Sequence, residues 1–140
     1  MNDVEPREIL KKYNSIVVYG MSANPEKASH VVPKYLSEHG YQIIPVNPKE
    51  EKILGRESYS RLQDVEEQID IVEVFRPSGE AVSIVEECLE RKKKRGDVAV
   101  IWLQEGIRNE DARNLAEKNG ITFVQDRCMY KEHRRSIMQK

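Results

Sequence analysis

Short apolar runs alternate along the chain with longer stretches in which apolar residues recur at helical spacing. The runs are rich in valine and isoleucine, and three are almost continuously apolar, which is typical of strands buried on both faces of a parallel sheet. The run Ile69–Phe75 alternates more, so we expect its strand to lie nearer an edge. The predicted strands are Ser15–Tyr19, Tyr41–Val46, Ile69–Phe75, Val98–Leu103 and Ile121–Val124.

The intervening stretches predict helices, each followed by a glycine that can end it. Pro33 fits the first of them only if it falls in the first helical turn. Ser78 is the expected N-cap of the second. The three helices are Ser29–His39, Ser78–Arg95 and Asn109–Asn119. Two more are expected at Pro6–Tyr13 and Tyr130–Met138, and Asn47–Val65 reads as irregular, with one helical turn near Asp64–Gln68.

Strands that alternate with helices form right-handed βαβ units and therefore a parallel sheet. We predict a single α/β domain over residues 1–140, a three-layer Rossmann-like fold with a five-stranded parallel sheet. Counted along the chain, its expected strand order is 3-2-1-4-5. Ligands of such sheets bind at the carboxyl ends of the strands beside the first one. The loops that should form a site follow Tyr19, Val46, Phe75 and Leu103.

The balance of charged residues indicates which kinds of partner are not expected. Lys and Arg number 23 against 24 Asp and Glu, a formal net charge of -1, which favours neither nucleic acid nor a polybasic membrane anchor. The basic run Arg91–Arg95 is expected to be a solvated helix end. No apolar run approaches the roughly 20 residues of a spanning helix. The segment MNDVEPREILKKY is acidic where a signal peptide would be basic, so we expect a cytoplasmic protein.

The cysteines and histidines do not form a recognisable chemical motif. Cys88 and Cys128 are too few for a disulfide scaffold, and the three histidines lack a zinc-binding spacing, so we expect no metal. Cys128 and His133 could act as nucleophile and base, but no orienting third group accompanies them, so structural roles are favoured. A redox alternative stays open, in which Cys128 forms a mixed disulfide with a bound thiol.

The loop after the first predicted strand is a candidate anion site. It reads GMSANP and keeps only Gly20 of the dinucleotide fingerprint GxGxxG. Backbone amides at the following helix N-terminus could still hold a phosphate. The side chains of Ser22, Asn24, Lys27 and Ser29 would add donors. The alternative is structural, with Gly20 turning the chain, Pro25 stiffening the loop and Ser29 capping the helix.

The end of the second predicted strand bears on which nucleotide is bound. NAD sites usually carry an acidic residue there, whereas this chain has PVNPK, with Asn47 and Lys49. A cation near the adenosine ribose suits an extra phosphate, which NADP carries at the 2′ position and coenzyme A at the 3′ position.

Two further strand ends carry candidate ligand contacts. Phe75 could cover an adenine or pantetheine and Arg76 could pair with phosphate, or they could merely begin the next helix and form a surface ion pair. Packing alone does not explain Gln104 and Glu105 at the fourth strand end.

Taken together, these residues resemble the small stand-alone CoA-binding proteins, which share a Rossmann-like domain with the N-terminal part of the succinyl-CoA synthetase α subunit. The resemblance runs from about Ser15 to His133. The matching segments, in chain order, are VVYGMSANPEKAS, YLSEHGYQIIPVNP, ILG followed by Tyr59, VEVFRP, VIWLQEGIRNEDA and QDRCMYKEH.

The resemblance implies that coenzyme A binds across the carboxyl ends of the strands. It places a phosphate loop first, then an adenosine-phosphate segment in which Lys52 is a second candidate beside Lys49. The implied contacts are Gly20, Met21, Ser22, Ala23, Asn24, Lys27, Ser29, Val46, Asn47, Pro48, Lys49, Phe75, Arg76, Leu103, Gln104 and Glu105. The phosphorylated histidine of the synthetases belongs to a second domain, and His133 is not its equivalent.

We therefore expect a non-catalytic protein that binds coenzyme A or acyl-CoA through phosphate-binding loops. The alternative is an NADP-dependent or other nucleotide-using enzyme. The sequence leaves open whether the chain forms a homodimer.

Overall fold

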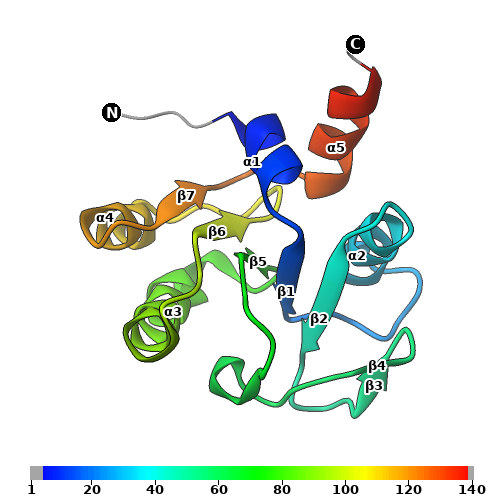
Figure 1. Cartoon of the computed structure of the whole chain (residues 1–140), viewed down its shortest axis with the longest axis horizontal. Helices are drawn as coiled ribbons and strands as arrows, with labels where there is room; N and C mark the ends of the chain where they lie inside the picture. The colour runs from blue at the N-terminus through cyan, green and yellow to red at the C-terminus, as the bar shows by residue number, and fades with distance from the viewer. Residues whose placement is uncertain (1–4, 139–140) are drawn as a thin grey trace.

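The computed structural model describes residues 5–138; the first four residues and the last two of the predicted domain lie outside it. A parallel five-stranded sheet forms the centre (Figure 1). Its strands are β1 (Ser15–Tyr19), β2 (Gln42–Val46), β5 (Ile71–Val74), β6 (Val100–Leu103) and β7 (Thr122–Val124). This confirms the predicted α/β, Rossmann-like class.

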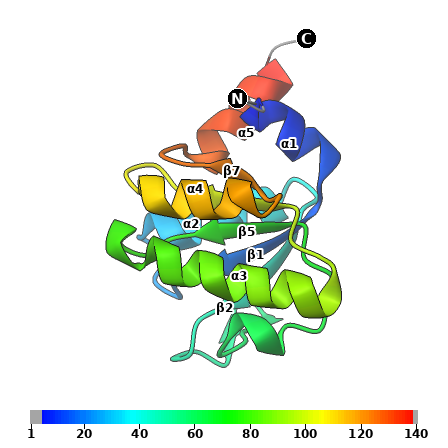
Figure 2. The same cartoon turned by 90° about the vertical axis from the view of Figure 1, so that its left-hand side faces the viewer.

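Helices cover both faces of the sheet, which gives the predicted three layers. Figure 2 shows α3 and α4 in front of the sheet, with α2 behind it. Apolar residues of α1, α2 and α5 pack on one face and those of α3 and α4 on the other. The bounds are α1 (Pro6–Lys12), α2 (Ala28–Ser37), α3 (Ala81–Arg95), α4 (Glu110–Lys118) and α5 (Met129–Met138).

The predicted strand order was wrong. The sheet runs β2-β1-β5-β6-β7, so the first strand separates the second from the third, and the order along the chain is 2-1-3-4-5. Pro45 gives a physical reason, because it cannot donate a hydrogen bond from its backbone and is therefore tolerated on an edge strand. It pairs with Val18 of β1, and β2 forms the edge of the sheet.

The expected edge position of the third strand was also wrong. β5 lies between β1 and β6, with Glu73 placed between Val18 and Trp102. The polar residue that produced the alternating pattern is completely buried, so the alternation reports a buried carboxyl group and not a solvent-exposed face.

The connection from β2 to β5 contains no α-helix. It forms a small antiparallel hairpin, β3 (Lys52–Ile53) with β4 (Arg56–Glu57), and then a 3-10 turn, η1 (Leu62–Asp64). The helical turn therefore lies earlier than the predicted Asp64–Gln68. The hairpin was not predicted because each strand is only two residues long.

Local details of two helices differ from the predictions. Pro33 lies beyond the first turn of α2 and is buried. Ser78 is not the N-cap of α3, because a 3-10 turn, η2 (Ser78–Glu80), precedes that helix. The Ser78 hydroxyl instead accepts a hydrogen bond from the Arg108 backbone N–H at 3.1 Å.

The basic run at the end of α3 is not wholly solvated. Arg91 is fully buried, whereas Lys93, Lys94 and Arg95 are exposed. Among residues 5–138, no helix is both long and apolar enough to cross a membrane.

Candidate ligand-binding site

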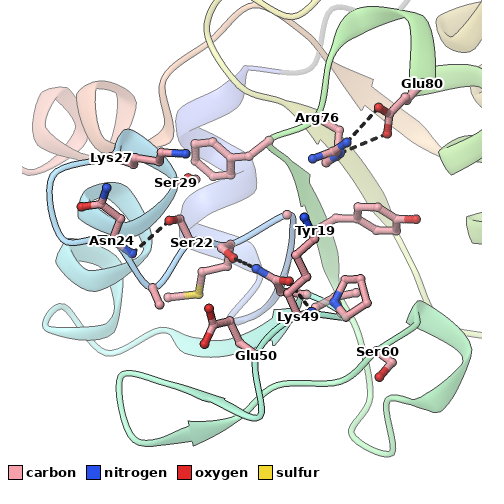
Figure 3. A pocket seen from close by; sticks show the side chains of 17 residues that line it. Tyr19, Ser22, Asn24, Lys27, Ser29, Lys49, Glu50, Ser60, Arg76 and Glu80 are labelled. Carbon is pink, nitrogen blue, oxygen red and sulfur yellow. Dashed lines mark hydrogen bonds and ion pairs between the residues drawn. The ribbon is translucent and has the colours of Figure 1, made fainter.

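A cavity of about 640 Å³ opens at the carboxyl ends of β1, β2 and β5 (Figure 3). It brings together thirteen of the sixteen predicted contacts: Gly20, Met21, Ser22, Ala23, Asn24, Lys27, Ser29, Val46, Asn47, Pro48, Lys49, Phe75 and Arg76. We call it the phosphate cavity, after the phosphate-binding loop that the sequence predicts there. Its wall also includes four residues that sequence reasoning missed, Tyr19, Glu50, Ser60 and Glu80.

The remaining predicted contacts lie elsewhere. Gln104 and Glu105 line a second cavity of about 730 Å³, which we call the distal cavity. Leu103 is fully buried and lines neither cavity, and Lys52 on β3 lines neither as well. The two cavities share Lys27, Ser29, Phe75 and Arg76, so they adjoin along a common wall.

Gly20 is required by the turn after β1. Its φ of +92° lies in the region that favours glycine, and its N–H donates to the Val46 carbonyl at 2.9 Å. A Cβ at this position would lie 2.9 Å from both the Phe75 carbonyl oxygen and Cδ of Arg76. The missing side chain therefore lets the Arg76 stem lie against the loop.

Pro33 explains how the loop attaches to α2. A residue at this position would normally donate its N–H to the Ser29 carbonyl, but proline has no N–H. The Ser29 carbonyl accepts instead from the Ser22 backbone N–H at 3.2 Å. The residue that looked like a defect in the helix thus leaves an acceptor that holds the phosphate-cavity loop.

The polar side chains of the loop also stabilise its conformation. The Ser22 hydroxyl accepts from the Asn24 N–H at 3.0 Å, and the Asn24 carboxamide oxygen accepts from the Glu26 N–H at 3.0 Å. The Ser22 carbonyl lies 2.7 Å from Nδ1 of His30, a buried residue of α2. These contacts stabilise the conformation of the loop.

The N-terminus of α2 faces this loop. Lys27 occupies the N-cap position and makes no side-chain cap, so the alternative reading of Ser29 as the cap was wrong. The first amides of a helix have no intrahelical acceptor and carry the positive end of its dipole. With Ala28 and Ser29 in the first turn beside the Lys27 ammonium, this helix start suits an anion.

Asn47 connects the loops that follow β1 and β2. Its carboxamide nitrogen donates to the Met21 carbonyl at 2.8 Å, and its oxygen accepts from the Lys49 N–H at 2.8 Å. The side chain that stands where NAD sites carry an acid is thus part of the cavity's framework. Lys49 lies beside it in the wall and supplies a cation.

Arg76 is oriented by an ion pair with Glu80. Its Nε and Nη2 donate to the two carboxylate oxygens at 3.0 and 2.9 Å (Figure 3). The hydrogen bond from Arg76 lowers the pKa of the Glu80 carboxyl. The sequence left two alternatives for Arg76, a surface ion pair or a position in the binding site. In the structure Arg76 has both, since it pairs with Glu80 and lines the cavity. A guanidinium has five N–H donors, so some are left for a second anion.

Comparison with known proteins identifies the family. A sequence model described as "CoA binding domain" matches residues 14–134. The chain belongs to the CoA binding domain family. It is 39% identical over 129 residues to the uncharacterised protein YneT of Bacillus subtilis, covering 92% of each chain.

Longer relatives carry a similar segment. The chain is 26% identical to a segment of the ADP-forming acetate–CoA ligase of Methanocaldococcus jannaschii, covering 82% of this chain but 17% of the ligase. The α subunit of the ADP-forming acetate–CoA ligase II of Pyrococcus furiosus is 28% identical, with 81% and 26% covered. The CoA binding domain thus corresponds to a minor part of these enzymes.

Solved structures share the whole fold. A hypothetical protein from Pyrococcus horikoshii superposes with a TM-score of 0.88 at 36% identity, covering 98% of this chain and 93% of that one. A protein from Thermus thermophilus superposes with a TM-score of 0.87 at 36% identity, covering 97% of this chain and 99% of that one.

The remaining chemical candidates, Cys88, Cys128 and His133, do not line the phosphate cavity. Cys128 is partly exposed in the wall of the distal cavity, whereas Cys88 is fully buried. Nδ1 of His133 lies 2.7 Å from the Tyr35 hydroxyl, and burial together with the nearby His39 lowers the pKa of His133. Within residues 5–138, no three His, Cys, Asp or Glu side chains gather to hold a metal ion.

Proposed function

We propose that this protein binds coenzyme A or an acyl-CoA in the phosphate cavity and does not itself catalyse a reaction. The observation that carries the proposal is the wall of that cavity. It joins the start of α2 to three cations, Lys27, Lys49 and Arg76, in a chain of the CoA binding domain family. Amides at a helix start and neighbouring cations are the groups that bind pyrophosphate and phosphate in proteins.

The framework of the cavity supports binding without rearrangement. Hydrogen bonds that involve Ser22, Asn47 and Gly20 connect the loops of the cavity to one another and to the sheet. A preorganised site loses less conformational entropy when it binds. Arg76 lies against Gly20 at the start of the loop between β1 and α2, and Lys27 lies at the end of this loop. Cations at two separate positions suit a ligand with separated phosphate groups.

The absence of catalysis is proposed from the lining residues. The described residues that line the two cavities include no histidine, Glu80 is paired with Arg76, and Glu105 is paired with Lys131. The Glu50 carboxylate and the Cys128 thiol remain, but they line different cavities, so they do not form a catalytic pair. A proton-transfer catalyst needs a titratable group that can reach the substrate. The cations and amides of the wall bind charge but do not accept a proton at neutral pH.

Calorimetric titration tests the ligand. We expect heat on addition of coenzyme A and acetyl-CoA, and none with NAD at the same concentrations. Binding of NADP without binding of either CoA ligand would overturn the proposal. Incubation with acetyl-CoA, followed by assay of free thiol, should show no release above the buffer control; sustained release would make the protein an enzyme.

A further inference from the structure

The distal cavity differs chemically from the phosphate cavity that it adjoins. Its cations, Lys27 and Arg76, belong to the shared wall. Beyond them the wall includes the apolar side chains of Val32, Pro77 and Ile107, together with Phe75 on the shared side.

The side-chain oxygens of Gln104 and Glu105, on the far side of the distal cavity, already accept hydrogen bonds. The side-chain oxygen of Gln104 accepts from the Met129 N–H at 3.4 Å. The Glu105 carboxylate accepts from Nζ of Lys131 at 3.0 and 3.3 Å, and this hydrogen bond is the main cause of the raised pKa of Lys131. With these groups engaged, the far wall offers a ligand mainly apolar surface.

From this arrangement we propose that the physiological ligand is an acyl thioester of coenzyme A, with its acyl chain in the distal cavity. The inference rests on the proposed function, because it places the phosphates of the same ligand in the phosphate cavity. Coenzyme A carries its phosphates at one end and its thiol at the end of a neutral pantetheine arm. An arm that crosses the shared wall brings the thioester to the distal cavity.

Burial of apolar surface distinguishes an acyl thioester from the free thiol. The distal cavity, of about 730 Å³, is within the usual size of ligand sites. Free coenzyme A would leave the exposed Pro77 and the half-buried Ile107 facing water. An acyl chain would cover them and gain affinity with each methylene group it buries.

Titration with a chain-length series tests the inference. We expect affinity to rise from coenzyme A through acetyl-CoA to butyryl-CoA and octanoyl-CoA, with butyryl-CoA binding about tenfold tighter than coenzyme A. Equal affinities across the series would overturn the acyl assignment and leave the proposed function intact. No binding of any member would instead refute the proposed function.

Variants localise the effect to the distal cavity. Ile107→Ser should remove most of the gain with chain length while leaving the affinity for free coenzyme A within about twofold. The matched control is Val31→Ser, since Val31 is 47% exposed on α2 and lines neither cavity. The control should keep the full gain; loss of the gain in both variants, or in neither, contradicts the placement.

Cys128 provides a second readout that needs no substitution. Its thiol lies in the distal cavity wall, so octanoyl-CoA should protect it from alkylation by iodoacetamide more than coenzyme A does at equal saturation. Buried Cys88 serves as the internal reference. Equal protection by the two ligands would count against the inference, even if Ile107→Ser failed to fold.

Discussion

Arg91 and Asp97 form an ion pair in the interior, with Nη2 of the arginine 2.9 Å from Oδ2 of the aspartate. Nε of Arg91 also donates to Asp97, and its two Nη atoms donate to backbone carbonyls of the β2–β5 connection, at Leu62, Val65 and Glu67. Asp97 accepts in turn from the Ile69 N–H just before β5. The pair therefore attaches the irregular connection to the end of α3, in place of the helix that is missing there.

Removing this arginine should destabilise the fold strongly. Arg91→Met leaves the Asp97 carboxylate and several carbonyls buried without their donor, and we expect the free energy of unfolding to fall by about 3–5 kcal/mol. Urea denaturation followed by circular dichroism measures it. Lys93→Met, at an exposed position two residues away, should change stability by less than about 0.5 kcal/mol. Similar losses in both variants would refute the structural role of the pair.

The sequence predicted the elements better than their arrangement. The positions of strands and helices follow from local periodicity. The basic run Arg91–Arg95 was also assigned correctly to the end of a helix. Nothing local distinguishes Arg91 from its exposed neighbours, because the carbonyls that it binds besides Asp97 lie at least 24 residues away. The strand order was within reach, since Pro45 indicates an edge strand and the predicted order placed it inside the sheet.

The buried carboxyl of Glu73 should make stability depend on pH. Both of its oxygens lack a hydrogen-bond partner within the described residues, and burial raises its pKa from 4.5 to about 8. Between about pH 4.5 and 8 the folded state keeps the proton on Glu73, whereas the unfolded chain loses it. The contribution of Glu73 to the free energy of unfolding is therefore highest below about pH 4.5 and declines as the pH rises to about 8. The slope is about 1.4 kcal/mol per pH unit between these values.

Substitution of Glu73 tests that slope. Glu73→Gln cannot ionise, so its stability relative to the parent should rise steadily between pH 5.5 and 7.5 in urea titrations. Glu86→Gln, at an exposed position on α3, should follow the parent at every pH. A constant difference between Glu73→Gln and the parent over this range would show that Glu73 does not change its charge there.

A side chain at position 20 should disturb both the loop and the ligand site. Gly20 and Gly40 have the same φ of +92°, but a Cβ at Gly40 meets nothing within 4 Å. Gly40→Ala should therefore cost about 1 kcal/mol, the backbone strain alone. Gly20→Ala should cost about 1–2 kcal/mol more, since its Cβ would contact the Phe75 carbonyl and the Arg76 stem.

The same pair of variants separates binding from folding. Gly20→Ala should weaken coenzyme A binding about tenfold by displacing Arg76, whereas Gly40→Ala should leave the titration unchanged. If both variants bind like the parent, the position of Arg76 against the loop does not matter for the ligand.

The sequence predicted those residues of the candidate site that directly follow a strand of the parallel sheet. The loops after parallel strands meet at one edge of a sheet, so Gly20, Asn47 and Arg76 could be assigned to one cavity. Glu80 was missed because its position in the wall depends on the 3-10 turn before α3 and on pairing with Arg76. Leu103, the last residue of β6, is buried in the core and lines neither cavity, which the sequence pattern did not predict.

The cations of the shared wall should act through phosphate. Lys27→Ala and Arg76→Ala should each weaken binding of coenzyme A about tenfold, because a hydrogen bond to a charged group is worth about 1.5–3 kcal/mol. Pantetheine, which lacks the phosphates, should lose much less affinity in either variant. Calorimetry with coenzyme A, dephospho-CoA and pantetheine measures the difference. Lys34→Ala, on the same helix but outside the cavity, is the matched control. Equal losses for all three ligands would show that Lys27 and Arg76 support the cavity without contacting phosphate.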